Sequence, residues 1–272
     1  MSSSEENTEL VIPALYERAY ADFGRLGRHL PEESVVSLAS EVLVRLTQNL
    51  GKADVPANDI EELSTALLSP DAKAAANLIE DRFRKGVDVQ SLYLQYLSPA
   101  ALRLGTQWES DNISFADVTV GTGRIYAIMR NLARRFPAPP LPEGKHALFA
   151  NVPGDNHTLG VKMAADLTRK VGWQVDLMLD PDHDKLIDAI GLSNYHIVGL
   201  SGAGEHALPS LARLVLALRV SAPRTHILIS GNIVEVAGDK VELMDVDAMA
   251  RTFEEAKQAL DTLWTRVGAD QQ

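Results

Sequence analysis

Residues 146–172 read HALFANVPGDNHTLGVKMAADLTRKVG, which is a short apolar run, a polar loop and a longer segment with helical spacing. This pattern predicts a buried strand followed by a helix that ends near Gly172. The alternation continues toward the C-terminus, with further strands predicted over 173–179, 195–201 and 225–230. Residues 234–246 give a weaker signal, and we expect a short helix and a fifth strand there. Strands and helices that alternate in this way predict a parallel five-stranded sheet with helices on both faces.

The residues before this segment have helical spacing throughout. Ser114 and Asp117 form the pattern of a capping box, which predicts a helix start. Several helices joined by short turns indicate a bundle. The predicted helices cover 10–26, 31–46, 60–68, 69–86, 89–107 and 114–135.

A proline-rich segment, FPAPPLPEGK at 136–145, separates the two patterns. Such a segment is extended and cannot continue a helix. The predicted organisation is a disordered N-terminus (1–9), an all-α helical bundle (10–135), a linker (136–145), an α/β domain (146–266) and a tail (267–272).

Composition excludes several classes of protein. The chain has 272 residues, with 26 Lys and Arg against 37 Asp and Glu, which gives a net charge of −11. Neither half is basic, so we expect no direct binding to nucleic acid. The absence of cysteine excludes disulfides, zinc–thiolate sites and cysteine nucleophiles. The N-terminus resembles no signal peptide and no apolar run has the length of a membrane span, so we expect a cytoplasmic protein without membrane contact.

Four loops follow the predicted strands, and ligands bind at this end of a parallel sheet. They read PGDNHTLG (153–160), LDPDH (179–183), SGAGEH (201–206) and SGNI (230–233). The first loop lacks the G-x-G-x-x-G of dinucleotide sites, and no GK[ST] phosphate-binding loop occurs. The third strand ends in serine rather than the aspartate of a receiver domain, and GLSGA lacks the second glycine of a hydrolase elbow. We find no catalytic constellation and expect no enzyme.

The hexamer DNHTLG, from Asp155 to Gly160, matches the D-x-H-x-x-G motif of cobalamin-binding domains. Those domains continue with S-x-L about forty residues later and with G-G after a further stretch. Here Ser201 follows Gly160 by 41 positions, and 26 residues separate Ala203 from Ser230. The chain therefore resembles cobalamin-binding proteins whose α/β domain is Rossmann-like (flavodoxin-like). The motifs depart from the family in two places, because S-x-L becomes Ser-Gly-Ala and G-G becomes Ser-Gly.

The resemblance implies a role for each motif residue. His157 would be the lower axial ligand of cobalt, and Asp155 would hydrogen-bond its other ring nitrogen. Gly160 would let the nucleotide tail of the cofactor pass close to the helix start. The other residues implied in cofactor binding are Thr158, Ser201, Gly202, Ala203, Ser230 and Gly231. The alternative is that Asp155 is an ordinary helix cap and His157 an N-terminal helix residue.

The helical half resembles the cap that precedes such domains. The segment LGTQWESDNISFAD (104–117) is similar to the cap of corrinoid methyl-carrier proteins and cobalamin photoreceptor repressors, in which a tryptophan covers the upper corrin face. Trp108 is the candidate here, and the alternative is a residue that packs between helices. The Glu-His pair of the photoreceptor repressors is replaced by Val118 and Thr119. His183 and His206 lie on the corrin-side loops and could act instead, or be ordinary surface histidines.

The stretch SFADVTVGTGRIY (114–126) looks most like the antirepressors of photosynthesis genes in purple bacteria, of the aerobic-repressor-regulating (AerR/PpaA) type. This resemblance implies a light- or redox-responsive regulator, a possible photoreceptor, that binds a DNA-binding transcriptional repressor protein. The upper ligand is left open, so adenosyl-, methyl- and hydroxocobalamin remain candidates. Two alternatives also remain open: a corrinoid carrier for a methyltransferase, and a heme sensor on the same scaffold with His157 as the iron ligand.

Overall fold

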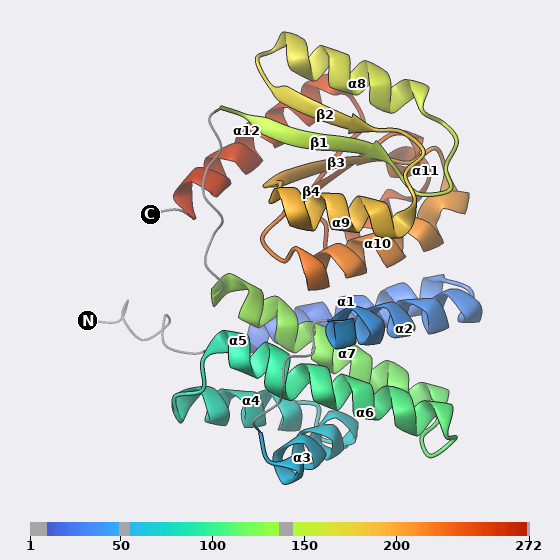
Figure 1. Ribbon diagram of the computed structural model, residues 1–272. Helices are drawn as coiled ribbons and strands as arrows, with labels where there is room; N and C mark the ends of the chain where they lie inside the picture. The colour runs from blue at the N-terminus through green and yellow to red at the C-terminus, as the bar shows by residue number, and fades with distance from the viewer. Residues whose placement is uncertain (1–9, 49–54, 136–143, 271–272) are drawn as a thin grey trace. The chain divides into compact units, whose positions relative to one another are not determined.

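The computed structural model describes residues 10–48, 55–135 and 144–270 (Figure 1). The chain divides into two compact units, residues 1–136 and 137–272, and each is described by itself. The predictions of a disordered N-terminus at 1–9 and, for residues 136–143, of a linker lie outside the described residues. Within the described ranges, no helix combines the length and apolar composition that a membrane span requires.

The first unit is helical, as predicted. Its α-helices are α1 (Pro13–His29), α2 (Glu32–Gln48), α3 (Ala57–Leu68), α4 (Ala74–Arg84), α5 (Val89–Ser91), α6 (Ser98–Glu109) and α7 (Phe115–Leu132). The predicted helix over 89–107 is divided, because residues Leu92–Leu97 between α5 and α6 form a π-helix (η1). The predicted capping box opens α7, where the Ser114 backbone N–H donates to Asp117 Oδ2 at 3.0 Å and the Asp117 N–H donates to Ser114 Oγ at 3.1 Å.

Helix α7 is the buried centre of this unit, with most of its side chains in the core. Gly123 allows α1 to approach closely, because a Cβ there would lie 3.0 Å from Phe23 Cδ1. Arg124 is buried as well, and its Nη1 donates to the carbonyl oxygens of Leu67 (2.8 Å) and Ser69 (2.7 Å). The guanidinium therefore satisfies carbonyl groups that the end of α3 leaves without helical partners.

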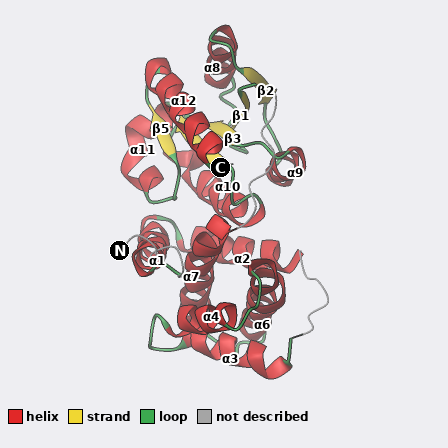
Figure 2. Cartoon of the chain, turned by 90° about the vertical axis from the view of Figure 1, so that its left-hand side faces the viewer, coloured by secondary structure: helices red, strands yellow, loops and turns green. Residues whose placement is uncertain are grey.

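The second unit is a five-stranded sheet in the order β2-β1-β3-β4-β5, and all of its pairings are parallel (Figures 1 and 2). The strands are β1 (His146–Asn151), β2 (Gln174–Met178), β3 (Ile197–Ser201), β4 (His226–Ser230) and β5 (Ala248–Ala250). The helices are α8 (Leu159–Lys170), α9 (His183–Ser193), α10 (Leu208–Ser221), α11 (Asn232–Glu242) and α12 (Phe253–Ala269). Both the parallel sheet and its position after the helical unit were predicted.

Helices cover both faces of the sheet, with α8 and α12 on one face and α9, α10 and α11 on the other (Figure 1). On the α8 and α12 face, Trp173 packs edge-to-face against Trp264 with ring centroids 5.8 Å apart. The chain leaves β1 toward one face and β3 toward the other, so the loops after these two strands flank the switch point of the sheet. Ligands of open α/β sheets bind at this point.

The structure corrects two sequence expectations near the C-terminus. The fifth strand is not within 234–246 but at 248–250, because α11 runs to Glu242 and a turn with Asp245 at a positive φ follows. Asp247 then fixes the start of β5 by accepting a hydrogen bond from the Ile227 N–H at 2.8 Å. Helix α12 also extends to Ala269, so three residues expected in the tail are helical.

Candidate functional site

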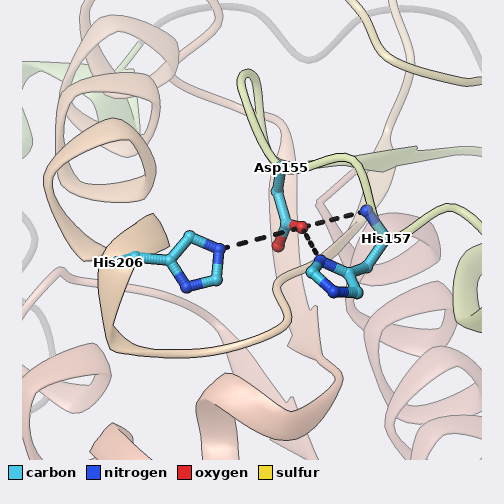
Figure 3. A group of neighbouring side chains, drawn as sticks. All are labelled: Asp155, His157 and His206. Atoms are coloured by element: carbon cyan, nitrogen blue, oxygen red, sulfur yellow. Dashed lines mark hydrogen bonds and ion pairs between the residues drawn. The ribbon is translucent and has the colours of Figure 1, made fainter.

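Asp155, in the loop after β1, is the centre of a polar cluster at the switch point (Figure 3). Its side chain is 1% exposed. One carboxylate oxygen, Oδ2, accepts the Ala203 backbone N–H at 2.6 Å. The other, Oδ1, accepts the His157 backbone N–H at 3.1 Å and lies 2.8 Å from His157 Nδ1. The carboxylate therefore joins the loop after β1 to the loop after β3.

The contact with Asp155 sets the proton position on His157. A carboxylate accepts hydrogen bonds, so Nδ1 carries the proton and Nε2 of the neutral ring keeps its lone pair. The His157 side chain is 72% exposed, which leaves Nε2 available to a ligand from solvent. A carboxylate behind an imidazole is the usual support of a metal-binding histidine, since it fixes the tautomer and raises the basicity of the ring.

Burial alone would raise the pKa of Asp155, but the hydrogen bonds from Ala203 and His157 outweigh burial and hold the pKa below its ordinary value. Asp155 is therefore ionised at neutral pH. The buried charge faces two donors from separate loops, and this arrangement makes it a fixed acceptor for the imidazole.

The three strands that precede the motif loops end side by side. Asn151 of β1 is in register with Ser201 of β3, and Ser201 is in register with Ser230 of β4. The Gly202 N–H donates to the Ser230 carbonyl at 3.1 Å, so the loops after β3 and β4 stay close beyond the sheet. The motif residues thus share one edge although they are distant in sequence.

Gly231 and Gly202 make the wall between these loops thin. Gly231 has a φ of +91°, and a Cβ there would lie 2.5 Å from the Gly202 carbonyl oxygen and 2.9 Å from Ser201 Oγ. A Cβ on Gly202 would lie 3.0 Å from Ile233 Cγ2. No side chain fits at Gly231, so glycine is required there by both backbone conformation and space.

The remaining motif residues lie around this edge. Gly160 is in the first turn of α8, and a Cβ on it would meet only Ser201 Oγ, at 4.0 Å. Thr158 is the N-cap of α8 and makes no side-chain capping bond. Ala203 follows β3, and its carbonyl accepts from Asn232 Nδ2 at 3.0 Å. Trp108, by contrast, lies near the end of α6 in the helical unit and is half-buried.

Two further residues complete the cluster. Asn151, fully buried at the end of β1, donates to the Asp155 carbonyl, and its Oδ1 accepts the Asp180 N–H at 2.7 Å. Asn151 was not among the residues predicted from the sequence, although a polar residue at the end of an apolar strand was a usable signal. His206 approaches from the 3₁₀ turn after β3, with Nε2 4.0 Å from Asp155 Oδ1. Sequence alone left His206 open between a functional and an ordinary surface histidine.

Comparison with known families gives both units a class. Residues 145–261 match the B12 binding domain family, and residues 59–133 match a second family that is also described as a B12 binding domain. Each unit thus contains a B12 binding domain, and the chain is a cobalamin-binding protein with a helical domain followed by a Rossmann-like domain.

A related protein gives more detail about the kind of cobalamin-binding protein. The chain is 27% identical over 180 residues, 65% of its own length and 90% of the relative, to an uncharacterized 20.5 kDa protein in the bchF-crtJ intergenic region of Rhodobacter capsulatus. The two family matches and this relative together fit the interpretation of the chain as a cobalamin-binding protein of the photosynthesis-gene type.

Solved structures of corrinoid proteins also match the chain. One is a novel cobalamin-binding protein from Desulfitobacterium hafniense DCB-2, with 20% identity over 75% of this chain and 98% of that one, at a TM-score of 0.41. Another is the monomethylamine corrinoid protein of Methanosarcina barkeri, with 16% identity, the same coverage and a TM-score of 0.40.

The residues of the α/β unit fit cobalamin. His157 offers a free imidazole nitrogen with a buried carboxylate behind it, and such a supported imidazole suits a transition metal such as cobalt. The absence of side chains at Gly160, Gly202 and Gly231 leaves backbone edges at the switch point.

Proposed function

We propose that the protein is a cobalamin-dependent regulator of transcription that acts in the cytoplasm by binding a DNA-binding repressor protein. The observation that carries this proposal is the relative encoded between bchF and crtJ. The net charge of −11 supports a protein partner rather than DNA, because binding to the phosphate backbone depends on clustered positive charge.

His157 is the proposed lower ligand of cobalt. Asp155 holds the Nδ1 proton, so the ring presents Nε2 outward, and the hydrogen bond to the buried carboxylate makes that nitrogen a stronger donor. Thr158 and Gly160 begin α8 directly beyond this ligand. Bound cobalamin supplies an upper ligand on cobalt that light or redox chemistry can remove or exchange.

The nucleotide tail is proposed to lie along the thin wall formed by the loops after β3 and β4. Ser201 Oγ is the polar group there, and it is close to the position that a Gly231 side chain would occupy. Ser230, Gly202 and Ala203 complete this wall with small side chains. Trp108 of α6 is the proposed residue against the upper corrin face, as the resemblance implies.

Absorption spectroscopy tests cofactor binding first. Purified protein is mixed with adenosyl- or hydroxocobalamin in the dark, passed through a desalting column, and recorded before and after illumination. We expect a retained corrin spectrum, and we expect His157→Ala to shift it toward that of the free cofactor. Loss of the corrin on the column would contradict the proposal, and retention of heme in a parallel sample instead would favour the heme sensor.

A DNA-binding assay tests the regulator. A photosynthesis-gene repressor from the source organism is titrated onto its operator with and without the cobalamin-loaded protein. We expect the loaded protein to raise the repressor concentration needed for half-saturation, with a smaller effect from His157→Ala. No effect on the repressor, combined with methyl transfer to or from the bound corrinoid by a methyltransferase, would identify a carrier instead.

A further inference from the structure

Asp155, His157 and His206 form a cluster that extends beyond the cobalamin motif. They come from the loop after β1 and from the 3₁₀ turn Glu205–Ala207 after β3, and one ligand atom from each lies within 4.8 Å of the others. Figure 3 shows the two imidazoles on either side of the carboxylate, both directed toward it. The ring centroids of the two histidines are 6.2 Å apart.

These three side chains match the donor set of a transition-metal site. Two imidazoles and one carboxylate suit divalent zinc, iron, nickel or copper, whereas calcium and magnesium prefer oxygen ligands. We propose that the protein, when it holds no corrinoid, binds one divalent transition-metal ion, with Zn²⁺ as the representative, through Asp155 Oδ1, His157 Nδ1 and His206 Nε2.

The distances require little movement. In a tetrahedral zinc site with bonds of about 2.0 Å, two ligand atoms lie about 3.3 Å apart. His157 Nδ1 is 2.8 Å from Asp155 Oδ1, and His206 Nε2 is 4.0 Å from the same oxygen. The His206 side chain is 60% exposed and so has room to move. A small rotation of this side chain brings Nε2 to the ligand spacing of a tetrahedral site. Asp155 stays fixed by the Ala203 N–H on its other oxygen.

Metal binding and cobalamin binding use opposite states of His157. In the proposed cobalamin site, Nδ1 carries a proton for Asp155 and Nε2 faces cobalt. In the metal site, Nδ1 gives up that proton and binds the ion together with Asp155, and Nε2 takes up a proton from solvent, so the ring stays neutral and Nε2 has no lone pair for cobalt. One ring cannot do both, so a free metal ion blocks the loading of cobalamin. This consequence rests on the proposed role of His157, whereas metal binding itself does not.

Cobalt(II) is the probe for the metal site, because it replaces Zn²⁺ and gives visible absorption when bound by nitrogen and oxygen ligands. Tag-free, corrinoid-free protein is titrated with Co²⁺, followed by displacement with Zn²⁺. We expect one ion per chain and a weakening of at least about tenfold in His206→Ala. His206 is exposed, so this variant should fold normally, as circular dichroism will show.

His146→Ala is the matched control. His146 also contacts an aspartate, with Nε2 2.7 Å from Asp176 Oδ2, but it lies at the start of β1, at the opposite end of the strand from the cluster. We expect this variant to bind Co²⁺ as the wild type does. Equal binding by His206→Ala and the wild type, or equal weakening in His146→Ala, would overturn the metal site.

Competition tests the link to cobalamin. Pre-incubation with Zn²⁺ should slow the uptake of hydroxocobalamin by the wild type and leave the uptake by His206→Ala unchanged. If Co²⁺ binds as expected but Zn²⁺ does not affect uptake, the shared use of His157 is wrong while the metal site stands. If no variant takes up cobalamin, the failure belongs to the proposed function and the Co²⁺ titration remains decisive for the metal.

Discussion

Asp155 holds together two loops that the sequence separates widely. The buried carboxylate accepts one backbone N–H from each loop as well as the imidazole of His157. An asparagine in place of Asp155 would offer only one oxygen to these donors, and its NH₂ group would face the remaining N–H donors. The residue therefore combines structural and ligand-positioning roles.

We predict that Asp155→Asn weakens cobalamin binding by about 10–100-fold, the usual cost of removing the residue behind a metal-binding histidine. Titration with hydroxocobalamin and absorption spectroscopy measure this change. Asp176→Asn is the control, because Asp176 also contacts a histidine, His146, at 2.7 Å. An equal loss in both variants would show that the effect is not specific to the site.

Gly231 illustrates a different constraint, in which the absence of a side chain is the feature. We predict that Gly231→Ala lowers the free energy of unfolding by about 3 kcal/mol, because it combines a positive φ with a 2.5 Å approach to the Gly202 carbonyl. Gly172 has a φ of +94° with open space around it, so Gly172→Ala should cost about 1 kcal/mol. Urea unfolding compares the two, and equal losses would argue against a crowded wall.

At the scale of elements, Asp247 secures the edge of the sheet. It accepts from Arg219 Nη2 at 2.6 Å and from the Ile227 N–H at 2.8 Å, and His226 Nδ1 lies 3.4 Å from its Oδ1. The Arg219 side chain is only 2% exposed. Burial would raise the pKa of Asp247, but the charges and hydrogen bonds of Arg219 and His226 together outweigh burial and hold that pKa well below its usual range.

We predict that Asp247→Asn lowers the free energy of unfolding by about 3 kcal/mol at neutral pH, because it removes the carboxylate 2.6 Å from the buried Arg219 guanidinium, while the Asp245 carboxylate lies farther away, at 3.9 Å. A depressed folded-state pKa stabilises the fold above the unfolded-state value of about 3.9, and this contribution is lost as pH falls through the folded-state pKa. Urea unfolding should therefore show a constant difference from wild type between pH 7 and 5 that shrinks below about pH 4. A difference that disappears already near pH 6 would contradict this assignment.

The elements that sequence could predict are those with a strong local signal. The capping box of Ser114 and Asp117 predicted the start of α7, and apolar runs predicted β1 to β4. Strand β5 was misplaced because three residues are too few to give a period. The π-helix over Leu92–Leu97 was missed because its sequence, LYLQYL, is compatible with an α-helix, so the spacing of its leucines does not distinguish the two.

The candidate site likewise combines contacts that could be predicted from the sequence with contacts that could not. The hydrogen bond between Asp155 and His157 was expected from the resemblance to cobalamin-binding domains, and the structure shows it at 2.8 Å. The approach of His206 to Asp155 and the hydrogen bond from the Asp180 N–H to Asn151 join separate loops, so local patterns do not predict these contacts, although the polar Asn151 at the end of an apolar strand was itself a signal. The crowding at Gly231 likewise comes from a neighbouring loop.

At the scale of the whole chain, each unit has its own core, as expected of independent domains. We predict that a fragment of residues 144–272 folds by itself and unfolds in one cooperative transition in urea. We also expect it to bind hydroxocobalamin, because the proposed cobalt ligand and tail wall both lie in this unit. A fragment that shows no cooperative transition would contradict the division into independent domains.

His157 is proposed to bind cobalt in place of the nucleotide base of the cofactor. Electron paramagnetic resonance of the cob(II)alamin-loaded protein tests it directly, since the lower nitrogen splits the cobalt lines. We predict that each triplet from ¹⁴N becomes a doublet when the protein carries ¹⁵N-labelled histidine and the cofactor is unlabelled. Triplets that survive this labelling would show that the nitrogen belongs to the cofactor, and would contradict the assignment of His157.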